Sequence, residues 1–112
     1  MKHPYTLEVC VDSVESALAA ARAGADRLEL CGNLIIGGTT PSIELFRCIR
    51  EQSDIRVHVL IRPRFGDFLY TEDEYQIMKR EIADFVEAGA EGVVIGSLNP
   101  DGSLNEEQMK GM

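Results

Sequence analysis

Residues 23–30 read AGADRLEL, and residues 88–95 read AGAEGVVI. Both stretches run from a small residue through glycine and a carboxylate into a short apolar segment. The glycine is typical of a helix end, because it readily takes the left-handed backbone conformation found there. The apolar segment is typical of a buried β-strand. Each stretch therefore predicts a junction at which a helix ends and a strand begins.

The same alternation extends along the chain. Four apolar segments have the length of strands, at residues 7–11, 28–30, 57–61 and 92–96, and helical patterns occupy residues 13–23, 43–51 and 72–88. The helix start signals that we identify are Asp12 with Glu15, Thr40 before Pro41, and Thr71 with Glu74. Strands that alternate with helices predict an α/β fold with a parallel sheet.

The polar residues of the first two strands share one face. Because side chains alternate between the faces of a strand, Glu8 and Cys10 lie opposite the apolar side chains, as do Glu29 and Cys31 in the second strand. A doubly wound sheet is usually apolar on both faces, since helices cover both. A barrel interior accommodates a polar face better, so we predict a TIM-type (β/α)8 arrangement.

The length of 112 residues holds about four βα units. Ser103 with Glu106 indicates the start of a fourth helix, and barrels of this type need about 200 residues or more. We therefore expect residues 1–112 to be a single domain, the N-terminal half of a barrel truncated in its fourth helix. The unpaired strands at its edges lead us to expect a homo-oligomer.

The amino-acid composition limits the classes of binding partner that we expect. A net charge of −8 and a pI near 4.7 argue against nucleic acid and against anionic membrane surfaces. No segment approaches the roughly 20 apolar residues of a membrane span, and the first ten residues lack the apolar stretch of a signal peptide. Three cysteines in such a chain indicate reduced thiols and a cytoplasmic location.

Cys10 and Cys31 are the candidate metal ligands. If their strands pair in register, the two thiols are neighbours at the C-terminal end of the sheet, and a close thiolate pair suits Cu(I). The alternative is that each cysteine is a small buried apolar residue. Cys48 fits the apolar side of a helix and is expected in the core.

Glu8, Glu29 and His58 are the candidate acid or base groups, all on the predicted interior face. The two glutamates are equally compatible with an ion-pair layer that includes Arg27 and Arg62. The alternative for His58 is that of most single inward-facing histidines, a hydrogen-bonded filler of the interior.

Arg62 and Arg64 follow the third strand, where barrel active sites lie, and two guanidinium groups there suit a phosphate or carboxylate. Pairing with Asp67 and nearby glutamates is the alternative. Gly37-Gly38 in the preceding loop fits either a backbone anion site or a tight turn.

Taken together, four stretches carry a family resemblance: LEVCVDSVESALAAARAGADRLELCGNL, GGTTPS, VLIRPRFGDFLYTEDE and AGAEGVVIGSLNPDG. The chain resembles the N-terminal half of the CutC family of copper homeostasis proteins. The resemblance implies a (β/α)8 barrel about twice this length, with Cys10 and Cys31 as copper ligands. Two positions depart from the usual family sequence: Thr39 replaces a leucine, and Phe65 replaces a small residue.

Three functional hypotheses stay open on the sequence. The first is a cytosolic copper homeostasis protein that binds Cu(I) through Cys10 and Cys31. The second is a TIM-barrel enzyme that acts on a small anionic substrate bound by Arg62 and Arg64. The third is an incomplete product without independent activity.

Overall fold

The computed structural model describes residues 3–112. Four strands form one parallel sheet: β1 (Glu8–Val11), β2 (Arg27–Leu30), β3 (Arg56–Leu60) and β4 (Gly92–Val94). Their order across the sheet is their order along the chain, β1-β2-β3-β4. Sequential order is that of a barrel, whereas the order reverses at a switch point in doubly wound sheets. The structure confirms the predicted α/β fold, a partial TIM-type barrel.

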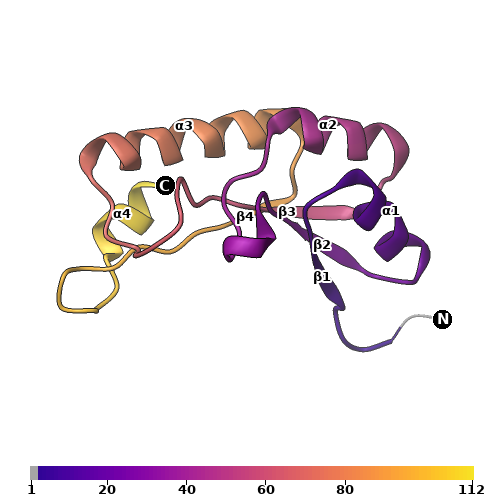
Figure 1. Ribbon diagram of the computed structural model, residues 1–112, viewed down its shortest axis with the longest axis horizontal. Helices are drawn as coiled ribbons and strands as arrows, with labels where there is room; N and C mark the ends of the chain where they lie inside the picture. The colour runs from indigo at the N-terminus through magenta and orange to yellow at the C-terminus, as the bar shows by residue number, and fades with distance from the viewer. Residues whose placement is uncertain (1–2) are drawn as a thin grey trace.

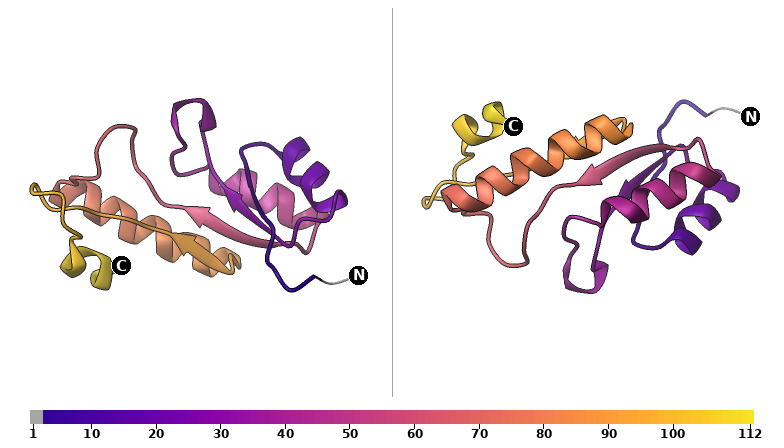
Figure 2. Two further views of the ribbon diagram at one scale, coloured as in Figure 1. Left: turned by 90° about the horizontal axis from the view of Figure 1, so that it is seen from below. Right: turned by 90° about the horizontal axis from the view of Figure 1, so that it is seen from above.

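Helices follow each strand. They are α1 (Val14–Arg22), α2 (Ile43–Gln52), α3 (Glu72–Ala88) and α4 (Glu106–Gly111), with a short 3₁₀ helix, η1 (Leu34–Ile36), between β2 and α2. Helices α2 and α3 run along one side of the sheet (Figure 1). Seen from below, the strands lie in front of these two helices (Figure 2, left). No helix within residues 3–112 is both long and apolar enough to cross a membrane.

The core lies between the sheet and these helices. Leu28, Leu30 and Val59 are fully buried on the face that the sequence predicts to be apolar. They pack with Phe46 of α2 and Phe85 of α3, whose rings meet edge to face with centroids 6.0 Å apart. The alternation of apolar and polar residues therefore predicts correctly which side of each strand contacts the helices.

The start of α3 confirms the predicted capping box. The hydroxyl of Thr71 accepts a hydrogen bond from the backbone N–H of Glu74, and the Glu74 carboxylate accepts one from the N–H of Thr71. The predicted ends of two helices are also confirmed, since Gly24 and Gly89 follow α1 and α3 with φ of +107° and +104°.

The predicted capping residues of the other three helices were wrong by one or two positions, although α2 begins at Ile43, as the pattern over residues 43–51 predicts. The capping residues are Ser13 for α1, Ser42 for α2 and Asn105 for α4.

The residues expected to cap these helices bind elsewhere. The Asp12 carboxylate accepts from the N–H of Leu34 (3.3 Å), and the Thr40 hydroxyl accepts from the N–H of Arg62 (2.8 Å). Ser103 donates its hydroxyl to Asp101 (2.6 Å) in the preceding turn. Loop contacts therefore take the side chains that a local pattern assigned to helix capping.

Candidate functional site

Cys10 and Cys31 lie on the same face of neighbouring strands, but they are not directly opposite each other. The register of β1 and β2 pairs Cys10 with Glu29 and Val11 with Leu30. Cys31 follows the last residue of β2, and its backbone N–H donates to the carbonyl of Val11 (2.9 Å). The two thiols are therefore offset by two residues along the strands.

One carboxylate oxygen lies between the two thiols. The Cys10 thiol donates to Oε2 of Glu29 at 3.8 Å, and the Cys31 thiol donates to the same oxygen at 3.4 Å. Cys31 also donates to the Glu29 backbone carbonyl at 3.7 Å. Glu29, one of the candidate acid or base residues, thus contacts both candidate metal ligands.

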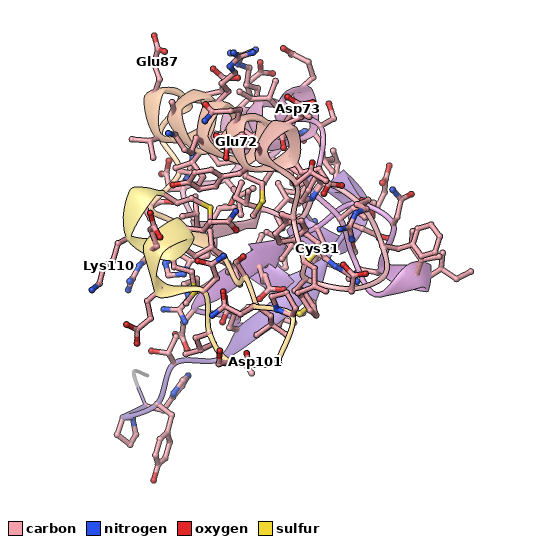
Figure 3. All side chains as sticks on the ribbon, turned by 90° about the vertical axis from the view of Figure 1, so that its left-hand side faces the viewer. Cys31, Glu72, Asp73, Glu87, Asp101 and Lys110 are labelled. Carbon is pink, nitrogen blue, oxygen red and sulfur yellow. The ribbon has the colours of Figure 1, made fainter. Side chains whose placement is uncertain are left out.

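The two thiols differ in access to solvent. Cys10 is exposed, whereas the exposed fraction of Cys31 is 1%. Figure 3 labels Cys31 where the sheet meets the loop that carries η1. All three cysteines are free, and Cys48 lies half-buried on α2 rather than fully in the core.

Both thiols of the pair are harder to ionise than an ordinary cysteine. Burial raises the pKa of Cys31 from 9.0 to about 12, and the hydrogen bond and negative charge of Glu29 add to the effect. Burial and the charge of Glu29 raise the pKa of Cys10 as well. Both are therefore protonated thiols near neutral pH in the metal-free protein.

Glu8, the second candidate carboxylate, pairs with an arginine of the neighbouring strand. Its Oε2 lies 3.2 Å from Nη2 of Arg27, and both side chains are partly exposed. This contact is the Glu8–Arg27 part of the ion-pair layer that the sequence offered as an alternative to acid or base chemistry. Arg62 has no part in it.

His58 lies on the same face of the sheet as Glu29. The register pairs it with Glu29 on one side and with Gly92 on the other. A Cβ at position 92 would be 2.9 Å from Nε2 of His58, so the glycine makes room for the imidazole ring. His58 and Glu29 are thus neighbours across β2 and β3.

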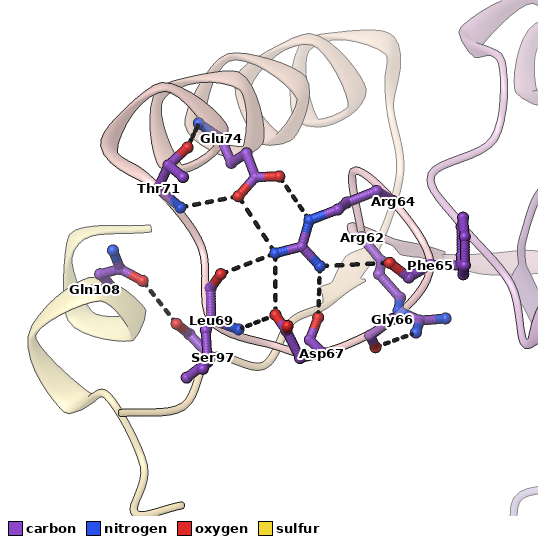
Figure 4. A network of polar contacts seen from close by, with 10 residues as sticks. All are labelled: Arg62, Arg64, Phe65, Gly66, Asp67, Leu69, Thr71, Glu74, Ser97 and Gln108. Atoms are coloured by element: carbon purple, nitrogen blue, oxygen red, sulfur yellow. Dashed lines mark hydrogen bonds and ion pairs between the residues drawn. The ribbon is translucent and has the colours of Figure 1, made fainter. Parts of the chain in front are cut away.

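Arg64 pairs with neighbouring acidic side chains, which is the alternative to the predicted anion site. Its guanidinium donates to Glu74 (2.7 Å) and Asp67 (3.1 Å), as well as to backbone carbonyls of the β3–α3 loop (Figure 4). The hydrogen bond from Arg64 lowers the pKa of Glu74. Arg64 also stacks on the ring of Tyr70, 5.1 Å from its centroid.

Arg62 binds no carboxylate in the described part of the chain. Its Nη1 donates to the carbonyl of Gly38 (2.9 Å) and its Nη2 to the carbonyl of Gly66 (2.8 Å), while the guanidinium stacks on Phe68. The side chain of Phe65, three residues before Phe68, is 67% exposed. Sequence reasoning missed the contact between Arg62 and Gly38, although Gly37-Gly38 was a signal that the backbone is closely approached there.

The thiol pair is a sparse metal site by itself. Within residues 3–112, no group of three or more His, Cys, Asp or Glu side chains is arranged to hold a metal ion. A surface depression of about 480 Å³ lies elsewhere, between α2 and α3, and is lined by residues such as Arg47 and Asp84. The arrangement therefore offers two soft ligands and an adjacent carboxylate, with no preformed cage.

Comparisons with known proteins identify the family of the chain. A sequence model described as the CutC family matches residues 5–112. The copper homeostasis protein cutC homolog of Homo sapiens is 50% identical over 103 residues, covering 92% of this chain and 38% of the human protein. A family protein CutC from Mesorhizobium japonicum is 47% identical, covering 92% of this chain and 40% of that protein.

A solved structure also matches. The crystal structure of CutC from Streptococcus agalactiae superposes with a TM-score of 0.87 at 32% sequence identity, over 96% of this chain and 53% of that one. The chain spans about 40% of the length of the two curated relatives above. With a family match over nearly all its residues and the same partial barrel, the chain belongs to the CutC family.

Proposed function

We propose that this chain serves copper homeostasis by binding Cu(I) at Cys10 and Cys31. Support for the link to copper comes from the relatives named copper homeostasis proteins. The observation that carries the site is the convergence of both thiols on one oxygen of Glu29, at 3.8 and 3.4 Å.

The ligand chemistry fits Cu(I) better than other common metals. Thiolates are soft ligands that select Cu(I), whereas a structural zinc ion takes four ligands that the described residues do not assemble here. The positive charge of the ion would offset the negative charges that oppose thiol ionisation in the free protein. Copper binding of this kind also requires reduced cysteines, so we propose that the protein works in the cytosol.

An anaerobic Cu(I) titration tests the proposal. The protein competes with a coloured Cu(I) chelator under reducing conditions, and we expect one copper ion per chain. Cys10→Ser and Cys31→Ser should each abolish this competition, because a single thiolate is a weak site. Cys48→Ser is the matched control, since Cys48 lies on α2 and its sulfur contacts Gln52 instead. Retained binding in the Cys10→Ser, Cys31→Ser double variant would refute the site.

A second candidate function rests on Arg62. This is an enzyme that binds a small anionic ligand, with acid or base work by Glu8, Glu29 or His58. The specific observation is that Arg62 donates to the backbone carbonyls of Gly38 and Gly66 and pairs with no carboxylate, while its Nε is buried without a partner in the described structure. Arg64 is occupied by Glu74 and Asp67, so we assign the anion to Arg62 first.

Inorganic phosphate is the simplest probe for this second function. We expect it to raise the thermal midpoint of the wild-type chain and of Arg47→Ala, an exposed arginine on α2. Arg62→Ala should lose the shift. An absence of stabilisation in the wild type over a panel of phosphate and carboxylate ions would refute this candidate.

We also propose that the 112-residue chain forms a homo-oligomer. In the described residues, β1 and β4 are the outer strands of the sheet, so each has an unpaired side. Light scattering should report a mass of at least two chains. A folded, monodisperse monomer would contradict this.

A further inference from the structure

The loop between β2 and α2 closes on itself beside Cys31. Gly32 and Thr39 form an isolated antiparallel bridge, with two backbone hydrogen bonds of 2.7 Å. Inside this bridge, the N–H of Gly38 donates to the carbonyl of Asn33 (3.1 Å). The segment that contains Gly37 and Gly38 is therefore folded back toward the end of β2.

Gly37 and Gly38 lie between Arg62 and Cys31. A Cβ at position 38 would lie 3.7 Å from Sγ of Cys31, and a Cβ at position 37 would lie 3.3 Å from Nη1 of Arg62. Both residues have positive φ, +92° and +91°, which glycine adopts without strain. The glycine pair thus lets the backbone pass closely between the thiol and the guanidinium.

Arg62 joins this loop to the next one. Nη1 donates to the carbonyl of Gly38 at 2.9 Å, and Nη2 donates to the carbonyl of Gly66 in the β3–α3 loop at 2.8 Å. Figure 4 shows the second of these bonds, beside the network in which Arg64 orders the same loop. The guanidinium of Arg62 therefore links the Gly37-Gly38 segment to the β3–α3 loop, which the hydrogen bonds of Arg64 hold in place.

We propose that Arg62 is a positioning residue that keeps the Gly37-Gly38 segment over Cys31 and so controls access to this thiol. Cys31 is 1% exposed while Cys10 is exposed, so an incoming ion reaches Cys10 first. It reaches Cys31 after the segment has moved and the Arg62–Gly38 bond has broken. The importance of this step for copper rests on the proposed function, but the cover itself does not.

Alkylation of the native protein tests the cover without any copper. Iodoacetamide at pH 8 labels the thiols, and mass spectrometry of peptides gives the rates at Cys31 and Cys48. We expect Arg62→Met to raise the ratio of the Cys31 rate to the Cys48 rate roughly ten-fold or more, because a charge-assisted hydrogen bond no longer holds the segment closed. Circular dichroism checks that the variant is folded.

A second pair of variants leaves Arg62 in place. Gly37→Ala introduces a Cβ against Nη1 of Arg62 and strains a positive φ, so it should also raise the ratio. Gly24→Ala is its matched control, because it carries similar strain at φ +107° with nothing within 4 Å of the added atom. We expect Gly24→Ala to leave the ratio unchanged.

Two results would overturn the proposal. One is an unchanged alkylation rate at Cys31 in both Arg62→Met and Gly37→Ala. The other is an equal acceleration at Cys31 and Cys48, which reports global unfolding and no local cover. Failure of the copper proposal is separate, since it would appear as absent Cu(I) binding in the wild type whatever the alkylation ratio.

Discussion

The proposed copper site predicts a steep dependence of Cu(I) affinity on pH. The pKa of Cys31 is about 12, and that of Cys10 is raised above 9.0, so both thiols carry protons from pH 6 to pH 8. Binding through two thiolates then releases two protons, and the apparent association constant should rise about a hundred-fold per pH unit. From pH 6 to pH 8 the expected gain is about 10⁴-fold.

Competition with a Cu(I) chelator at pH 6, 7 and 8, corrected for protonation of the chelator, measures this slope. Cys48→Ser should keep the slope of two. A wild-type slope of one or less would refute the reasoning, because it would mean that one cysteine is not a ligand or is already ionised.

Three further predictions concern stability. Phe46→Ala should lower the free energy of unfolding by about 3–5 kcal/mol in urea denaturation, because Phe46 is fully buried against Phe85, while Ile77→Ala at an exposed position should change it by about 0.5 kcal/mol at most. Thr71→Ala should cost about 1 kcal/mol by removing the hydroxyl that accepts from the N–H of Glu74, and an unchanged urea midpoint would contradict that role. The pKa of Cys31 is about 12 in the folded state against 9.0 for an ordinary thiol, so its contribution to stability is complete below pH 9 and is lost as the pH rises toward 12. Wild type should therefore lose more stability over this range than Cys31→Ala, and parallel losses in the two proteins would contradict the assignment.

Local patterns in the sequence were sufficient for much of the fold. The two-residue period of strands such as β2 and β3 predicts which side chains enter the core, because the alternation is a property of the extended backbone itself. The capping box of Thr71 and Glu74, and the glycines that end α1 and α3, act within a few residues. Such signals are readable before any tertiary contact is known.

The candidate site was only partly predictable. The sequence placed Cys10, Glu29 and Cys31 on one face, which the structure bears out through their shared hydrogen bonds. It left the roles of Arg62 and Arg64 open, because a guanidinium reaches partners in several loops. Only the folded chain shows Arg64 among acidic groups and Arg62 among carbonyls.

The sequence by itself determined the order of strands and helices, the buried face of the sheet and the shared face of the thiols. The tertiary structure decided three further features: the two-residue offset between Cys10 and Cys31, the burial of Cys31 beneath the β2–α2 loop, and the use of Asp12 and Thr40 as loop anchors in place of helix caps. The physical reason is the range of the interactions. Periodicity and capping act between near neighbours in the chain, whereas register and loop anchoring join segments about 20 residues apart. The burial of Cys31 depends on a loop that folds back over the end of its own strand.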